Sequence, residues 1–202
     1  MRISHGQLED ARRDPAAWLR SRAASTGFSG QSKLQNLGWA LRVYHRESLE
    51  SALLYLERRF EARHYRRLDA YIGYLLGYDQ QFKLKPACQV VFGDRVALPL
   101  GNDVELRGEI GRLDVEAVAG YSVWLFTEEF PQNWTRQLRM PLLQMHYASK
   151  MGAPSDEVSV GFYSYSQARY LSTSYSASRI ARAVSEARRL SSRIGGPSAV
   201  FE

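Results

Sequence analysis

Apolar and polar residues alternate along residues 104–129, and the rest of the chain can be ordered around this stretch. Apolar side chains at every second position are typical of strands that bury one face, whereas helices repeat every three or four residues. We therefore predict two half-buried strands on either side of a turn at Ala119 and Gly120. The apolar positions that form this pattern are Ile110, Leu113, Val115, Val118, Val123 and Leu125.

Before this stretch, apolar residues recur with the spacing of amphipathic helices. A first helix is predicted over residues 7–20, with Ser4 as a candidate N-cap and Pro15 dividing the helix into two pieces. Ser32 is placed to cap the next helix. Three further helical runs are predicted at residues 34–44, 49–60 and 68–78, and a loop at residues 23–31.

The pattern returns to strands at residues 87–100. Gly93 and Asp94 lie in the middle of this run and are a pair typical of a hairpin turn. Gly101 and Asn102 supply a second turn before the alternating stretch begins. The sequence therefore predicts two turns within the strand-rich part of the chain.

A strong helical pattern opens at Pro131 and is ended by Gly152 and Pro154. Pro141 inside this pattern either kinks the helix or marks its true start. The remaining predictions are strands at residues 158–165 and 168–172 and a last amphipathic helix, capped by Ser174 or Ser176, that runs to Leu190.

The order of these elements is several helices, an antiparallel meander, a helix, a strand pair and a final helix. This order predicts an α/β or α+β fold. A chain of 202 residues is long enough for one substantial core, so we expect a single domain over residues 1–202. Residues 1–85 would form its mainly helical part, and residues 86–202 its sheet-and-helix core.

Composition restricts the function classes. The formal net charge is +6, which favours a polyanionic partner such as nucleic acid. The single cysteine, Cys88, excludes an internal disulfide and an all-cysteine metal site within one chain, and the four histidines lack metal-ligand spacing. No run approaches the roughly 20 apolar residues of a membrane span, so we expect no membrane partner and a cytoplasmic protein.

A basic stretch at residues 58–67 is a candidate surface for phosphates. It contains Arg63, Arg66 and Arg67, which we list as candidate nucleic-acid-binding residues. The alternative is a solvated helix face whose arginines pair with neighbouring carboxylates, and the sequence leaves both interpretations open.

Four motifs occur in a familiar order. Ile3 to Leu8, followed by Pro15 to Trp18, has the form of an opening "S…L…CP" helix without its cysteine, and Gly111-Arg112-Leu113-Asp114 has the form "G-x-x-D". Residues 121–128 lie where a strand with "(D/E)-x-K" would follow, and Gln144 with Tyr147 approximates a "Q-x-x-x-Y" helix. In these motifs the chain resembles the RecB-like branch of the PD-(D/E)XK nuclease superfamily, including the CRISPR-associated RecB-like exonucleases, over nearly its whole length.

This resemblance implies a restriction-endonuclease-like mixed sheet with flanking helices and a helical N-terminal region. It implies that Asp114 ligates Mg²⁺ in an active member, and that Arg112, Gln144 and Tyr147 contact nucleic acid, DNA rather than RNA. Members of the branch act in DNA processing and repair, CRISPR adaptation and phage defence. The same resemblance places Leu125 and Thr127 at the second carboxylate and the lysine, so the expected function is a catalytically degenerate nuclease fold that still associates with nucleic acid.

Two alternatives stay open. In the first, the chain is an active Mg²⁺-dependent nuclease with a migrated site, in which Asp114 with Glu116 or Glu128 supplies the catalytic carboxylates, and Asp114 with Glu128 holds the metal. In the second, it is an assembly subunit that binds other protein subunits through its aromatic segments at residues 65–78 and 163–175. Asp114 has a purely structural interpretation as well, in which it pairs with a strand arginine, Arg112 or Arg107.

Overall fold

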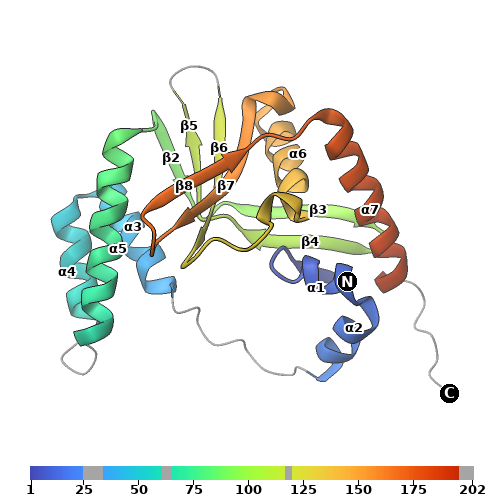
Figure 1. Cartoon of the computed structure of the whole chain (residues 1–202), viewed down its shortest axis with the longest axis horizontal. Helices are drawn as coiled ribbons and strands as arrows, with labels where there is room; N and C mark the ends of the chain where they lie inside the picture. The colour runs from blue at the N-terminus through green and yellow to red at the C-terminus, as the bar shows by residue number, and fades with distance from the viewer. Residues whose placement is uncertain (25–33, 61–64, 117–119, 196–202) are drawn as a thin grey trace.

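The computed structural model describes residues 1–24, 34–60, 65–116 and 120–195, and within these ranges it confirms a mixed α+β fold. Figure 1 shows the elements arranged as two sheets with helices packed on both sides. The helices are α1 (Leu8–Arg13), α2 (Pro15–Ala24), α3 (Gln35–Arg46), α4 (Leu49–Phe60), α5 (Tyr65–Leu84), α6 (Arg139–Met151) and α7 (Ala177–Gly195), with short 3₁₀ turns η1 (Trp134–Arg136) and η2 (Ser155–Glu157).

The strands form one sheet of three and one of five. The smaller sheet has the order β1-β4-β3, with β1 (Arg2–Ser4) parallel to β4 (Val104–Glu109) and β3 (Arg95–Gly101) antiparallel to it. The larger sheet has the order β2-β5-β6-β7-β8. Its strands are β2 (Gln89–Phe92), β5 (Arg112–Val115), β6 (Tyr121–Thr127), β7 (Val158–Ser164) and β8 (Arg169–Thr173). The β6 and β7 strands run parallel because α6 crosses between them.

One long, bent hairpin joins the two sheets. Its first arm is β2 followed by β3, and its second arm is β4 followed by β5. Both arms bend at the same level, where the Ile110 amide donates a hydrogen bond to the Asp94 carbonyl at 3.0 Å. Gly93 has φ +64° at the bend, and a side chain on Gly111 would come within 2.7 Å of the Phe126 ring. Glycine is therefore required at both positions.

The predicted hairpin turn at Gly93 and Asp94 is wrong, because the chain bends there and continues into the other sheet. The reversal occurs at Asn102 and Asp103, with φ of 48° and 55°. Two consecutive positive φ angles are the requirement of the type I′ hairpin turn, which Asn and Asp tolerate. The prediction of a second turn at Gly101 and Asn102 was thus correct to within one residue.

The other predicted helices are present with different ends. The predicted N-cap Ser4 lies in β1, and Gln7 precedes α1 instead; α5 and α7 both extend beyond their predicted ranges. Pro15 does divide the first helix, into α1 and α2. The helix predicted from Pro131 begins instead at Arg139, which puts Pro141 in the first turn, where no intrahelical amide bond is lost. Gly152 ends it with φ +65°. The predicted helix cap Ser32 and the predicted turn residue Ala119 lie outside the described residues. None of the described helices is long and apolar enough to cross a membrane.

The five-stranded sheet has two different faces. On one face, α6 packs aliphatic side chains, among them Met140 and Leu143, against Leu113, Val123 and Leu125. On the other face, α3, α4 and α5 pack through a cluster of aromatic rings that includes Tyr78, Tyr163 and Tyr165. The three-stranded sheet is covered by α1, α2 and α7, as Figure 1 shows.

Candidate functional site

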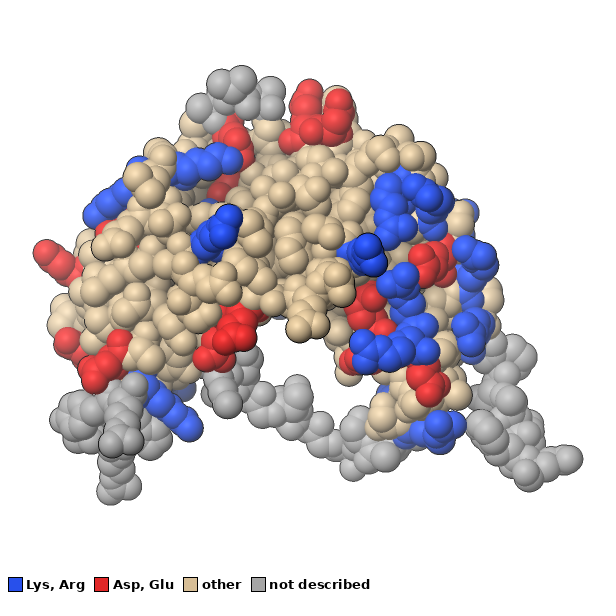
Figure 2. Space-filling view, in the orientation of Figure 1, with Lys and Arg blue, Asp and Glu red and all other residues tan. Residues whose placement is uncertain are grey.

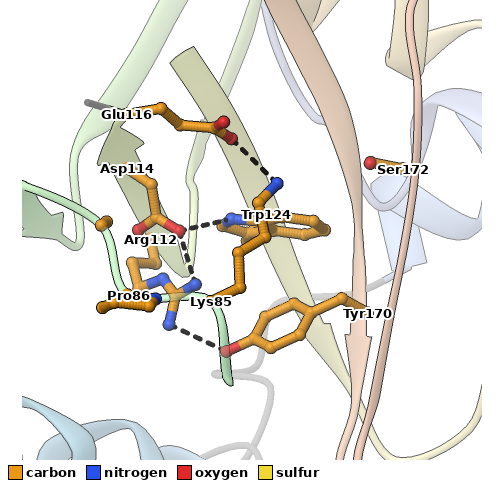
Figure 3. A pocket seen from close by; sticks show the side chains of 9 residues that line it. Lys85, Pro86, Arg112, Asp114, Glu116, Trp124, Tyr170 and Ser172 are labelled. Atoms are coloured by element: carbon orange, nitrogen blue, oxygen red, sulfur yellow. Dashed lines mark hydrogen bonds and ion pairs between the residues drawn. The ribbon is translucent and has the colours of Figure 1, made fainter. Parts of the chain in front are cut away.

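A pocket of about 440 Å³ opens on the aromatic face of the larger sheet, beside Asp114 (Figure 3). This volume lies in the range of small-ligand sites. The pocket is lined by Lys85, Pro86 and Ala87 between α5 and β2, by Arg112, Asp114 and Glu116 along and after β5, by Trp124 of β6, and by Tyr170 and Ser172 of β8.

Strand register decides which side chains face Asp114. In the antiparallel pair of β5 and β6, Asp114 lies opposite Ser122 and Arg112 opposite Trp124. Opposed residues in a sheet project from the same face, so Ser122 and Trp124 share the pocket face with Asp114. Leu125 lies on the other face, in the aliphatic core against α6, and is 5% exposed.

This register corrects the alignment that placed Leu125 and Thr127 at the second carboxylate and the lysine. The β6 residues that flank Asp114 on its own face are Ser122 and Trp124. The correction leaves the chemical conclusion of the alignment unchanged, because a hydroxyl and an indole supply neither a carboxylate nor an ammonium group.

Asp114 is held by two donors in the protein interior. It is 5% exposed, and its Oδ2 accepts hydrogen bonds from Arg112 Nη2 at 2.5 Å and from Trp124 Nε1 at 2.8 Å. Burial raises the pKa of the Asp114 carboxyl above its usual value, against the opposing effects of Arg112 and Trp124. The interpretation of Asp114 as a partner of Arg112 is confirmed, although the pair is buried rather than exposed.

Arg112 is the centre of the aromatic cluster. It is 2% exposed, and its Nη1 donates to the hydroxyls of Tyr78 and of Tyr170, the latter at 2.9 Å. Its guanidinium carbon lies 5.1 Å to 5.3 Å from the ring centres of Tyr78, Phe82 and Tyr170, within the range of cation–π attraction. The predicted contact of Arg112 with nucleic acid would require this buried side chain to leave its partners.

Glu116 shares the pocket with Asp114, and Glu128 does not line it. Glu116 Oε1 accepts hydrogen bonds from Ser122 Oγ at 2.6 Å and from Lys85 Nζ at 3.2 Å, and these donors lower the pKa of Glu116. Glu128 follows the far end of β6 and accepts a hydrogen bond from the Tyr74 hydroxyl at 3.4 Å. Of the candidate catalytic carboxylates, the structure therefore brings Asp114 and Glu116 to one pocket.

These two carboxylates do not fit an Mg²⁺ site. Mg²⁺ requires oxygen ligands with free lone pairs in near-octahedral geometry. Asp114 Oδ2 and Glu116 Oε1 each accept two hydrogen bonds, and Asp114 Oδ1 is buried without a partner among the described residues. A guanidinium 2.5 Å from Asp114 would repel a second cation. Among the described residues there is no group of three or more His, Cys, Asp or Glu side chains placed to hold a metal ion.

Gln144 and Tyr147 of α6 lie on the opposite face of the sheet, and both are fully buried. The Gln144 amide donates to the carbonyls of Ser155 and Tyr175, at 2.6 Å and 3.1 Å, and accepts the Tyr175 amide at 2.7 Å. The Tyr147 hydroxyl donates to Asp94 at 2.8 Å. These side chains join α6 to neighbouring segments, and the sheet separates them from the Asp114 pocket.

The candidate arginines of the 58–67 stretch do not line the pocket as far as they are described. Arg67 is exposed in the first turn of α5. Arg66 is described only as part of the α5 backbone, and Arg63 lies outside the described residues. The aromatic segments offered as a protein contact surface are largely internal, since Tyr71, Tyr78 and Tyr163 belong to the buried aromatic cluster.

Sequence reasoning missed several pocket residues. The face of Trp124 was recoverable from the sequence, because Trp124 alternates with the apolar Val123 and Leu125. Its position opposite Arg112 was not, because a hairpin that turns at Ala119 and Gly120 has a different register. Lys85, Tyr170 and Ser172 come from other elements, and they reach the pocket only through the packing of α5 and β8. No local signal in the sequence marks them.

The exposed cations gather on another part of the molecule. Figure 2 shows a concentration of Lys and Arg over α7 and the adjoining α1 and α2, with some Asp and Glu among them. On α7, Arg182, Arg188, Arg189 and Arg193 are exposed and Arg179 is half-buried. No described carboxylate forms an ion pair with any of these five, whereas Glu186 of the same helix is paired with Arg12 at 2.6 Å. The surface of α7 is therefore strongly cationic.

Comparisons with known proteins add little to this geometry. No family model matches the chain, and no curated protein matches it. Among solved structures, the crystal structure of SSO0001 is similar, with a TM-score of 0.31 and 10% sequence identity over 90% of this chain and 85% of that chain. A likeness at this level carries no argument about function.

Proposed function

We propose that this protein binds nucleic acid without cleaving it, as a degenerate member of the nuclease-like fold that its sequence resembles. The observation that carries the proposal is the bonding of Asp114. The carboxylate that a nuclease would use for metal binding is occupied by Arg112 and Trp124 inside the protein. A buried ion pair with an added indole hydrogen bond is a structural element, and its removal costs stability rather than turnover.

The binding half of the proposal is supported by charge. The formal net charge is +6, and none of the five arginines of α7 has a described carboxylate partner. Such a surface supplies the sequence-independent, salt-sensitive part of nucleic-acid affinity. DNA is the expected partner because the resemblance is to DNA-processing nucleases, and a role in repair, CRISPR adaptation or phage defence belongs to the same proposal.

The test combines a binding titration with a cleavage assay. Labelled single-stranded and duplex DNA are titrated with the protein at rising salt, and the same DNA is incubated with protein and Mg²⁺ or Mn²⁺. The expected result is binding at low salt that weakens steeply with salt, while the DNA stays intact. Absence of binding at low salt would refute the proposal.

Two variants make the cleavage arm decisive. Asp114→Asn removes the charge of the central carboxylate, and Glu116→Gln removes that of the half-buried one without disturbing the Arg112 pair. Metal-dependent cleavage by the wild type that is lost in Glu116→Gln, with an unchanged melting temperature, would establish an active migrated site. The same loss in Asp114→Asn counts only if circular dichroism shows that this variant remains folded.

A further inference from the structure

Four of the five arginines of α7 lie along one side of the helix, whereas the exposed Arg188 lies about 100° around the axis from Arg189. Arg179, Arg182, Arg189 and Arg193, here called the arginine stripe, follow spacings of three, seven and four residues. With 3.6 residues per turn these spacings keep all four on one side, and the stripe is about 21 Å long at a rise of 1.5 Å per residue. Glu186 lies within it, but its charge is offset by Arg12 of α1.

Most of the apolar surface of α7 is covered, and Val184 is its one large apolar side chain that is only partly buried. The apolar side chains Ile180, Ala183, Ala187, Leu190 and Ile194 are buried against the three-stranded sheet and its neighbours. A helix that lies in a membrane interface inserts large apolar side chains into the acyl boundary. The exposed positions of α7 beside the stripe are small, for example Ala181, Ser185 and Ser192. A lipid surface would therefore meet charge with little apolar insertion.

The stripe lacks the side chains that stack on unpaired bases. Recognition of unstacked bases uses aromatic platforms, and α7 contains no aromatic residue. Arginine is the side chain best adapted to phosphate oxygens, to which its guanidinium presents parallel N–H donors. A row of arginines without aromatic neighbours fits a sugar–phosphate backbone.

We infer that the arginine stripe of α7 is the surface that binds the nucleic-acid backbone, without reading its sequence. This inference rests on the proposed function and gives it a location. None of the residues that line the Asp114 pocket belongs to α7. The inferred binding surface is therefore separate from the pocket where the resemblance would place substrate.

The experiment compares two variants of equal charge. The stripe variant carries Arg179→Gln, Arg182→Gln, Arg189→Gln and Arg193→Gln. The control carries the same change at exposed arginines of α3, β3, β4 and β8, all outside the 58–67 stretch, namely Arg46→Gln, Arg95→Gln, Arg107→Gln and Arg169→Gln. Each variant loses four positive charges, so both have a formal net charge of 6 − 4 = +2.

Affinity for a 20-base-pair duplex of each of two sequences is measured by fluorescence anisotropy between 50 and 200 mM salt. If all four arginines contact phosphates, the stripe variant loses about 3.6 from the slope of log K against log salt, and the control keeps the wild-type slope. The two duplexes are expected to bind equally. Replacing the four stripe arginines by lysine should restore most of the slope, because that variant keeps the charge.

The outcomes separate this inference from the proposed function. Wild-type binding at low salt with equal losses in the two glutamine variants would overturn the stripe and leave nucleic-acid binding intact. A stripe variant that binds duplex DNA with the wild-type affinity and salt slope would also overturn the stripe and leave nucleic-acid binding intact. No wild-type binding at low salt removes both proposals. Stripe-dependent sedimentation with phosphatidylserine vesicles, without duplex binding, would assign the surface to a membrane and refute the inference.

Discussion

The two faces of the five-stranded sheet belong to the same strands but are stabilised by different interactions, aliphatic packing on one face and buried polar contacts on the other. On the α6 side, Leu113, Val123 and Leu125 meet aliphatic side chains, and the contact depends on volume and shape. On the side of α3, α4 and α5, the alternate residues Arg112 and Asp114 meet hydroxyls, rings and an indole. The first face tolerates changes of equal volume, whereas the second depends on every polar partner being present.

The largest expected effect is the loss of one member of the buried pair. Arg112→Leu leaves Asp114 charged and without its cation, which should lower the free energy of unfolding by about 3–5 kcal/mol at neutral pH. Adding Asp114→Asn should recover part of this loss. Urea unfolding of the two variants measures both quantities, and a loss below about 1 kcal/mol would contradict the buried, paired geometry.

The matching change on the aliphatic face is Leu143→Ala. Leu143 is fully buried against this face, so its truncation should cost about 2–5 kcal/mol through lost burial and a cavity. The cost should be the same at pH 5 and pH 8, because no ionisable group is involved. The cost of Arg112→Leu should instead shrink as the pH is lowered, since protonation of Asp114 removes the uncompensated charge. If the stability cost of Leu143→Ala and that of Arg112→Leu depended on pH in the same way, the proposed difference between the two faces would be contradicted.

His45 makes the aromatic face sensitive to acid. Its Nε2 lies 2.7 Å from the Tyr78 hydroxyl, and burial, followed by the nearby Arg112, lowers the pKa of His45 from 6.5 to about 4. A depressed folded-state pKa means that the unfolded chain binds the proton more readily. The stability from neutral His45 is therefore present above pH 6.5 and is lost as the pH falls toward 4.

His45→Gln tests this prediction by removing the titrating group while keeping an acceptor for Tyr78. The unfolding free energy of the variant should fall less steeply than that of the wild type between pH 6.5 and 4. Burial lowers the pKa of His5 and His146 as well, so part of the slope should persist. Identical slopes for wild type and variant would exclude His45 as a contributor.

The smallest effect is expected at Tyr163. Its hydroxyl is buried and has no hydrogen-bond partner among the described residues. Because an unpaired buried hydroxyl carries a desolvation cost, Tyr163→Phe should change stability by less than about 1 kcal/mol, or raise it slightly. Tyr78→Phe, which removes a hydroxyl bonded to Arg112, should be clearly destabilising. Thermal unfolding of Tyr163→Phe and Tyr78→Phe measures both changes in stability, and equal losses in the two variants would contradict the difference in hydrogen bonding.

Much of the fold could be predicted from the sequence because its signals are local. Pro15 divides the first helix by its missing amide, and Gly152 ends α6 through a positive φ. The alternating pattern gave β5 and β6 correctly. The predicted turn at Gly93 failed, because glycine signals an unusual backbone angle but not whether the chain reverses or bends there.

The candidate site divides in the same way. The sequence by itself identified Asp114 and Arg112 as residues of interest and determined the cationic character of the chain. Only the tertiary structure decided that Arg112 neutralises Asp114 in the interior, that Ser122 and Trp124 are its neighbours on β6, and that Lys85 and Tyr170 complete the pocket. The physical reason is that charge and periodicity are properties of a local stretch, whereas burial and pairing depend on the register and packing of segments far apart in the chain.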